Sequence, residues 1–190
     1  MKFTRCKIED VILVEPKVFA DDRGYFVETY RQDKLEEFLG FEINFCQDNE
    51  SKSNRGVLRG LHYQLYPMSQ SKLVRVIKGR VLDVAVDIRK GSPTFGKYVA
   101  VELSGKNKKQ LFVPRGFAHG FLVLEDDTIF AYKVDNYYSP EHDRGIAFDD
   151  KFINIDWDFP KEELQLSQKD MKQVSLKDAE IFDYEVNLYE

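Results

Sequence analysis

Cysteine, histidine and tryptophan are scarce in this chain of 190 residues, which has two, three and one of them, respectively. A small disulfide-bonded secreted domain would carry more cysteines, so we expect Cys6 and Cys46 to be reduced, with Cys46 buried. No apolar run approaches the roughly 18 residues of a membrane-spanning helix. The first residues also lack the apolar core of a signal peptide. We therefore expect a cytoplasmic protein.

An excess of positive charge is also missing, because the formal net charge is -5. This argues against general nucleic-acid binding, although 28 lysines and arginines leave enough cations for a local basic pocket. Aromatic residues are plentiful instead, and fifteen phenylalanines with ten tyrosines favour a β-rich structure. The length suits one domain that spans residues 1–190.

The apolar pattern predicts many short strands separated by turns. The clearest pair of strands covers 73–78 and 81–88, which are joined at Gly79. In 81–88 the apolar residues alternate with Asp83 and Asp87, as in a strand that is buried on one face and meets a polar environment on the other. Further strands are expected at 24–30, 43–46, 57–66, 98–103, 110–113, 120–124 and 129–134.

Helices are rare in this pattern. A helix is predicted at 33–39, where Gly40 would end it, and short helices are expected to wrap the core after residue 140. Short strands with a turn after every ten or so residues predict a mainly β protein, either a sandwich or a barrel. The alternating helices of a TIM barrel are missing.

A histidine in an extended run is the first candidate for chemistry. His62 shares a strand face with Gly60 and Gln64, and Lys72 follows nearby. A histidine of near-neutral pKa can take a proton, and a nearby cation could stabilise the anion that proton removal creates. For an isolated histidine a purely structural role is the commoner one. Asp83 favours the chemical role, because a carboxylate inside a barrel needs a partner or a polar cavity.

The run 114–121 contains a second candidate motif. Its pattern Pro-x-Gly-x-x-His resembles the second motif of cupins, which are small jelly-roll β-barrels. In metal-binding cupins a His-x-His pair supplies further ligands, but here His62 is followed by Gln64, and His142 lies in a separate loop. Two histidines without an acidic partner make a poor metal site. The resemblance therefore implies a cupin-type barrel without a catalytic metal and with a few short peripheral helices.

Over residues 10–170 the joint order and spacing of several motifs resemble the dTDP-4-dehydrorhamnose 3,5-epimerase family. The matching segments are 19–26, 47–51, 56–64, 72–74, 83–89, 92–96, 114–121, 132–133 with Tyr138, and 166–170. The resemblance implies a nucleotide-linked 4-keto-6-deoxyhexose as substrate, inverted at C3 and C5 through an enolate, without a cofactor. It implies that His62 is the base, Asp170 its partner, Tyr132 the acid and Lys72 the cation at the enolate oxygen.

The same resemblance implies a set of substrate-binding positions and a homodimer with exchanged N-terminal strands. The implied positions are Arg23, Phe26, Glu28, Gln47, Asn49, Arg59, His119, Tyr138, Asp143 and Lys169, with Asp83 as a polar residue of the pocket. Tyr138 would stack on the nucleotide base. Arg23 and Glu28 are expected to complete the pocket of the neighbouring subunit.

Two departures from the family pattern stand out. Asp143 replaces the usual glutamate, so that contact could be weaker or could be made by Glu141. Asp150-Lys151 replaces an Asp-Pro pair in the peripheral tail, where we expect no effect on chemistry.

Three other functions remain open from the sequence. They are a relative that inverts only C3 or C5, a binding module without activity, and a metal-dependent cupin oxygenase or isomerase. The presence of a candidate base and a candidate acid argues against simple binding, which needs neither.

Overall fold

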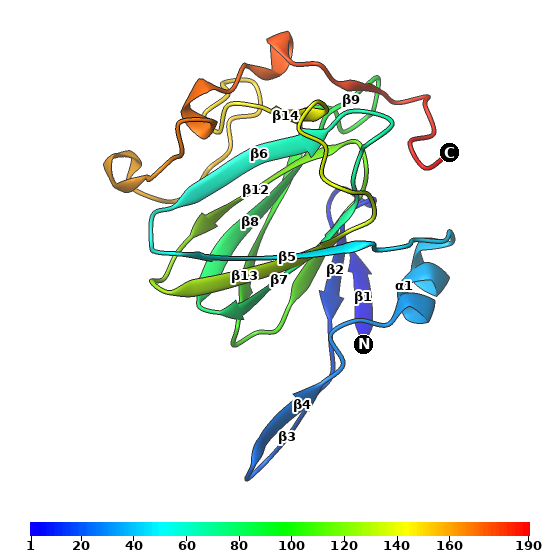
Figure 1. The fold of residues 1–190 in the computed structure, drawn as a ribbon, viewed down its shortest axis with the longest axis vertical. Helices are drawn as coiled ribbons and strands as arrows, with labels where there is room; N and C mark the ends of the chain where they lie inside the picture. Colours follow the sequence, from blue (N-terminus) through cyan, green and yellow to red (C-terminus); the bar gives the residue numbers. More distant parts are fainter.

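Two antiparallel sheets lie face to face in the computed structural model, which describes residues 1–190, and form a jelly-roll barrel (Figure 1). The six-stranded sheet has the order β1 (Lys2–Arg5), β2 (Ile12–Glu15), β11 (Gln110–Val113), β7 (Lys72–Lys78), β13 (Thr128–Val134) and β5 (Gln47–Ser53). The five-stranded sheet has the order β10 (Tyr98–Ser104), β8 (Arg80–Asp87), β12 (Phe117–Val123), β6 (Leu58–Gln64) and β14 (Asp143–Gly145).

Smaller elements decorate the barrel. A hairpin of β3 (Val18–Asp21) and β4 (Gly24–Val27) projects from one end, and β15 (Phe182–Asp183) pairs in parallel with β9 (Arg89–Lys90). The one α-helix, α1, spans Gln32–Leu39 and ends at Gly40 in the left-handed conformation, as predicted. Three short 3-10 helices follow at Lys161–Glu163 (η1), Asp170–Lys172 (η2) and Leu176–Asp178 (η3). None of the helices has the length and apolarity that crossing a membrane would require.

Strand β8 is buried on both of its faces. Val81 and Ala85 face the cluster between the two sheets, whereas Val84 and Val86 face a second cluster on the outer side of the five-stranded sheet. The C-terminal part of the chain covers that outer side with Trp157, Leu176, Phe182 and Leu188, among others. The period of two in this strand therefore arises from two packed layers. The prediction that the tail wraps the core is confirmed.

The predicted strand pair 73–78 and 81–88 is divided between the two sheets. Strand β7 pairs with β11 and β13, and β8 pairs with β10 and β12. Gly79 makes the turn between them with φ +82°, and a Cβ atom there would lie 2.1 Å from Thr128 Oγ1. Only glycine combines this backbone conformation with this close approach.

Two predictions about residues 43–53 are wrong. Residues 43–46 form no strand, and the strand of this region is β5, Gln47–Ser53. Its sequence QDNESKS contains no apolar residue, because β5 is an edge strand with alternately exposed and half-exposed side chains. Cys46, expected to be buried, is exposed. The apolar pattern gives no signal for an edge strand of this kind.

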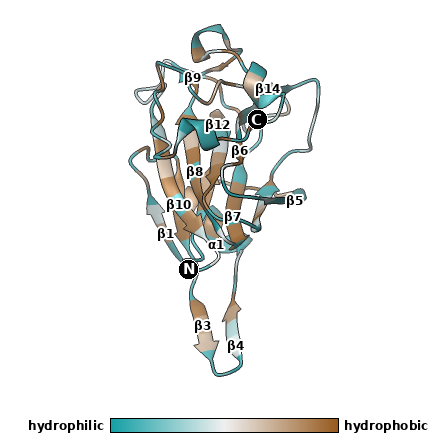
Figure 2. Ribbon diagram, turned by 90° about the vertical axis from the view of Figure 1, so that its left-hand side faces the viewer, coloured by the Kyte–Doolittle hydropathy of each residue, from teal (hydrophilic) through white to brown (hydrophobic).

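The β3–β4 hairpin exposes apolar side chains away from the barrel. Figure 2 shows it as an arm that extends below the two sheets, with brown segments on β3 and part of β4 and a teal turn. Phe19, Tyr25 and Phe26 are 49%, 60% and 65% exposed, respectively. An apolar patch that the rest of the chain leaves uncovered commonly marks an interaction surface.

Replacing Gly79 by alanine should lower the free energy of unfolding by about 2 kcal/mol or more, because a positive φ and a steric clash act together. Gly91→Ala is the matched control, since Gly91 has φ +92° but its nearest contact to a Cβ would be 3.7 Å. We expect the control to lose about 1 kcal/mol. Urea unfolding monitored by circular dichroism measures both. Equal losses in the two variants would show that the clash with Thr128 is relieved.

Candidate active site

A cavity of about 290 Å³ opens between β6 of one sheet and strands β5, β7 and β13 of the other. Most of the predicted site residues line it. The lining residues are Gln47, Asn49, His62, Tyr63, Gln64, Gln70, Lys72, Tyr132, Tyr138, Asp143 and Lys169. The arrangement places polar side chains from strands far apart in sequence around one volume, as a site for a polar ligand requires.

His62 and Asp170 form a hydrogen-bonded pair at this cavity. His62 Nε2 lies 2.6 Å from Asp170 Oδ1, and Ser167 Oγ donates to Asp170 Oδ2 at 2.6 Å. Burial raises the pKa of Asp170, but the hydrogen bonds from His62 and Ser167 outweigh burial, so its pKa lies below the ordinary value. An ionised carboxylate only accepts hydrogen bonds, so the ring proton is on Nε2. Nδ1 of His62 is then the nitrogen that can take a proton.

Lys72 supplies a buried cation next to His62. It is the first residue of β7, is 9% exposed, and donates from Nζ to the carbonyl oxygen of His62 at 3.3 Å. Burial lowers the pKa of Lys72 to about 8, against the raising influence of the Asp143 and Asp83 carboxylates. The ammonium form therefore prevails at neutral pH, and Lys72 lines the cavity in which a ligand would bind.

Tyr132 lies across the cavity from His62, because β13 and β6 belong to opposite sheets. Burial raises the pKa of its hydroxyl above the ordinary value, with a smaller opposing influence from Arg59. The phenol is therefore protonated at neutral pH and can donate. The cavity thus has a proton acceptor on one wall and a proton donor on the other.

A second histidine–carboxylate pair lies deeper in the barrel. His119 Nε2 lies 3.0 Å from both oxygens of Asp83, and the two residues are 6% and 0% exposed. Burial lowers the pKa of His119, although Asp83 opposes this. The partner that Asp83 needs inside the barrel is thus present. His119 does not line the cavity, and neither does Arg59, whose guanidinium donates to Ser53 Oγ at 3.1 Å.

Asp143 and Lys169 form an ion pair at the mouth of the cavity. Tyr138 joins them, because its hydroxyl donates to Asp143 Oδ2 at 3.0 Å. Asp143, and not Glu141, lines the cavity, so the shorter side chain reaches both partners. The rings of Tyr137 and Tyr138 are both largely exposed beside the opening.

Arg23, Phe26 and Glu28 do not meet the other predicted residues within this chain. They lie on or just after the projecting hairpin, where Arg23 pairs with Asp21 at 2.6 Å and Glu28 pairs with Arg31 at 3.6 Å. Neither pair contacts the cavity.

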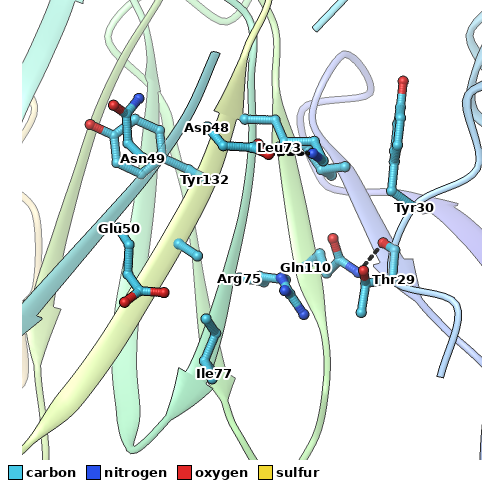
Figure 3. A pocket seen from close by; sticks show the side chains of 12 residues that line it. Thr29, Tyr30, Asp48, Asn49, Glu50, Leu73, Arg75, Ile77, Gln110 and Tyr132 are labelled. Atoms are coloured by element: carbon cyan, nitrogen blue, oxygen red, sulfur yellow. Dashed lines mark hydrogen bonds and ion pairs between the residues drawn. The ribbon is translucent and has the colours of Figure 1, made fainter. Parts of the chain in front are cut away.

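A neighbouring hollow of about 280 Å³ shares Asn49 and Tyr132 with the cavity. Figure 3 shows Tyr132 and Asn49 side by side at one end of this hollow, and Arg75, Gln110 and Thr29 toward the other. Gln110 Nε2 donates to the backbone oxygen of Thr29 at 2.7 Å. Ala131 and Lys133 line the hollow and lie on the opposite face of β13 from Tyr132, so the hollow is on the outer side of the six-stranded sheet, near the base of the hairpin.

The prediction from sequence missed three lining residues, Tyr63, Gln64 and Gln70. Gln64 fixes the loop before β14, since its amide bonds Met68 O at 2.6 Å and Tyr137 O at 3.1 Å and accepts from Ser139 N at 2.7 Å. Its alternation with His62 was the only available signal. Gln70 lies in a segment without any periodic pattern, so no signal could have found it.

Comparison with known proteins identifies the family. A family model described as dTDP-4-dehydrorhamnose 3,5-epimerase matches residues 5–178. The chain belongs to this family. The dTDP-4-dehydrorhamnose 3,5-epimerase of Shigella flexneri is 54% identical over 182 residues, which cover 96% of this chain and 99% of that protein.

Solved structures agree with this assignment. A dTDP-6-deoxy-D-glucose-3,5-epimerase from Legionella pneumophila, in complex with dTDP-4-keto-L-rhamnose, superposes with a TM-score of 0.93 at 45% identity, covering 97% of this chain and 99% of that one. A 3'-monoepimerase from Streptomyces bikiniensis, in complex with dTDP-quinovose, superposes with a TM-score of 0.84 at 31% identity. The superposition covers 90% of this chain and 86% of that one. Members of the 3,5-epimerase family are isomerases, and this chain is one of them.

The lowered pKa of Lys72 predicts how its loss changes stability. An unfolded chain keeps the Lys72 proton up to about pH 10.5, whereas the folded protein releases it near pH 8, so the wild-type free energy of unfolding should gain a contribution as pH rises between these values. Lys72→Met should lack this contribution and be more stable than wild type at pH 7. The exposed Lys97 gives the control Lys97→Met. Urea unfolding at pH 7, 8, 9 and 10 tests this, and parallel curves for Lys72→Met and wild type would contradict it.

Proposed function

We propose that this protein inverts C3 and C5 of dTDP-4-dehydro-6-deoxy-D-glucose and so forms dTDP-4-dehydro-L-rhamnose, a step toward dTDP-L-rhamnose. Its membership of the 3,5-epimerase family supports this proposal. The observation that carries it is the arrangement around one cavity, in which the His62–Asp170 pair and Tyr132 occupy opposite walls beside the Lys72 ammonium.

The chemistry follows from the ketone at C4. The hydrogens at C3 and C5 are both α to this carbonyl, so removing either one leaves the electron pair delocalised onto the ketone oxygen as an enolate. His62 Nδ1 accepts the proton, and the ionised Asp170 stabilises the imidazolium that forms. The Lys72 ammonium stabilises the negative enolate oxygen. Protonation of the same carbon from the opposite face by the Tyr132 hydroxyl then inverts it.

Proton balance defines what happens between the two inversions. After one inversion His62 carries an extra proton and Tyr132 has lost one, so the pair is restored by proton exchange with solvent. Because burial raises the pKa of Tyr132, its phenolate recovers a proton readily at neutral pH. Only protons move and nothing is oxidised, so the reaction requires no redox cofactor.

The nucleotide would lie at the mouth of the cavity. Lys169 and Arg59 are the cations that could meet the diphosphate, which would displace Asp143 from its ion pair with Lys169. The exposed ring of Tyr138 is available to stack on the base. Gln47 and Asn49 line the same opening and supply polar contacts. His119 would approach the substrate from the barrel interior, because its Nε2 is hydrogen-bonded to Asp83 there.

We further propose that the protein works as a homodimer in which each β3–β4 hairpin crosses to the partner. The exposed Phe19 and Phe26 would be covered there, and Arg23 and Glu28 would reach the partner's cavity. A two-fold arrangement is the commonest oligomer. Cys6 and Cys46 are both free, in keeping with a cytoplasmic location.

Proton NMR in D2O tests the chemistry. With dTDP-4-keto-6-deoxy-D-glucose, wild type should incorporate deuterium at both C3 and C5, and His62→Asn should slow incorporation at both centres by at least about 100-fold. His142→Asn is the control, since His142 bonds Ser139 outside the cavity. Incorporation at one centre alone would favour a monoepimerase like that of Streptomyces bikiniensis. Unchanged incorporation in His62→Asn would refute His62 as the base.

Mixing two inactive variants tests the shared site. Arg23→Ala removes a residue of the hairpin and His62→Asn removes the base, so each homodimer should have little activity. If Arg23 acts in the partner's cavity, heterodimers contain one complete site, and an equal mixture recovers up to roughly a quarter of wild-type activity. Analytical ultracentrifugation measures whether wild type, each variant and the mixture form dimers. A mixture no more active than its components would place Arg23 outside the partner's site.

A further inference from the structure

The last residues of the chain dock on the barrel close to the proposed site. The family model ends at residue 178, and the segment beyond it runs across one end of the barrel to the side that carries α1 (red in Figure 1). Phe182 and Leu188 are buried in the cluster outside the five-stranded sheet. The ring of Tyr189 packs on Phe41 with 4.7 Å between ring centroids. The segment is thus anchored immediately before Tyr189 and at the Tyr189 ring itself.

The Tyr189 hydroxyl joins two strand connections. It lies 2.8 Å from Ser71 Oγ and accepts the backbone N–H of Arg115 at 3.2 Å. Burial raises the pKa of Tyr189 to about 12, so the hydroxyl keeps its proton. Since Arg115 already donates to the hydroxyl oxygen, the tyrosine proton is available to Ser71.

Ser71 is fully buried and immediately precedes Lys72. Its N–H donates to Asp135 Oδ1 at 2.6 Å, and its carbonyl oxygen accepts from the Asp135 N–H at 3.3 Å. Its hydroxyl lies between the Tyr189 hydroxyl and the Asp135 carboxylate, whose pKa it helps to lower against the larger effect of burial. Asp135 is itself held by Arg115, whose Nε lies 3.1 Å from Asp135 Oδ2. Arg115 in turn donates from Nη1 to Leu188 O at 2.7 Å, so the network closes through the tail.

This network limits how Lys72 can move. Lys72 is the first residue of β7, so ladder bonds to β11 and β13 fix the chain after it, whereas the residues before it belong to no strand. We infer that Tyr189 is a positioning residue for Lys72 that acts through the hydroxyl of Ser71. The inference rests on the proposed role of Lys72 at the enolate oxygen. A small displacement of this ammonium would weaken stabilisation of the enolate more than binding of the nucleotide.

The test compares Tyr189→Phe, Ser71→Ala, the double variant and the control Tyr184→Phe. Tyr184 lies on the same tail and packs on Arg89, but no hydrogen bond of its hydroxyl is present. Deuterium incorporation at C3 and C5 gives kcat and KM for each protein. Tyr189→Phe and Ser71→Ala should each lower kcat roughly 3- to 10-fold, with KM unchanged and Tm lowered by no more than about 4 °C. The double variant should be no slower than the slower single variant.

A second readout does not depend on turnover. The 15N chemical shift of the Lys72 ammonium should move in Tyr189→Phe and in Ser71→Ala, and stay at its wild-type value in Tyr184→Phe. If wild type fails to exchange substrate hydrogens, the proposed function falls, while the 15N shift still reports whether Tyr189 positions Lys72. An unchanged shift in Tyr189→Phe overturns the inference. So does a wild-type kcat, or a loss of kcat that Tyr184→Phe reproduces.

Discussion

The hydrogen bond between His62 and Asp170 joins residues that are 108 positions apart, and the proposed catalytic arrangement depends on it. A strand can present a histidine to a cavity, but it cannot by itself choose which ring nitrogen carries the proton. That choice requires an acceptor fixed on one side of the ring. Asp170 provides it from the start of η2, and Ser167 holds the second carboxylate oxygen. The C-terminal part of the chain must therefore be folded against β6 before His62 can take the proposed role of base.

This constraint explains why the five-stranded sheet is covered on its outer face. Leu58 and Leu61 on β6 point to the same outer cluster as Ile146 and Leu176 of the C-terminal part. Burial of these apolar groups holds the polypeptide that carries Asp170 in place. The interior of the barrel is left to accommodate charge, and there Asp83 is matched by His119 and lies near Lys72. Apolar packing on the outer face thus holds the segment that carries Asp170, whereas the pairing of charged groups inside the barrel compensates for their burial.

The sequence predicts those parts of the structure that apolar periodicity encodes. Strand β8 is recognisable because its apolar residues alternate with Asp83 and Asp87, although the structure shows that both of its faces are packed, and α1 is recognisable because a glycine ends it. Strand β5 was missed because its seven polar residues lie at a sheet edge, where no apolar face is needed. The pairing of His62 with Asp170 came from family resemblance alone, since no local pattern relates residues so far apart. Neither apolar periodicity nor family resemblance indicates the contact of Tyr189 with Ser71.

The hairpin projects away from the barrel, and this leaves the cavity of a single chain only partly enclosed. The proposed roles of Lys72 and Tyr132 at an enolate favour low exposure, and in one chain Lys72 is buried whereas Tyr132 is half-buried. His62, by contrast, has a side chain that is 30% exposed, so the cavity is open to solvent beside the histidine. Water in that opening would screen the ammonium and compete for the enolate oxygen. In the proposed homodimer, the hairpin of the second copy, with its exposed Phe19 and Phe26, is the element best suited to exclude this water.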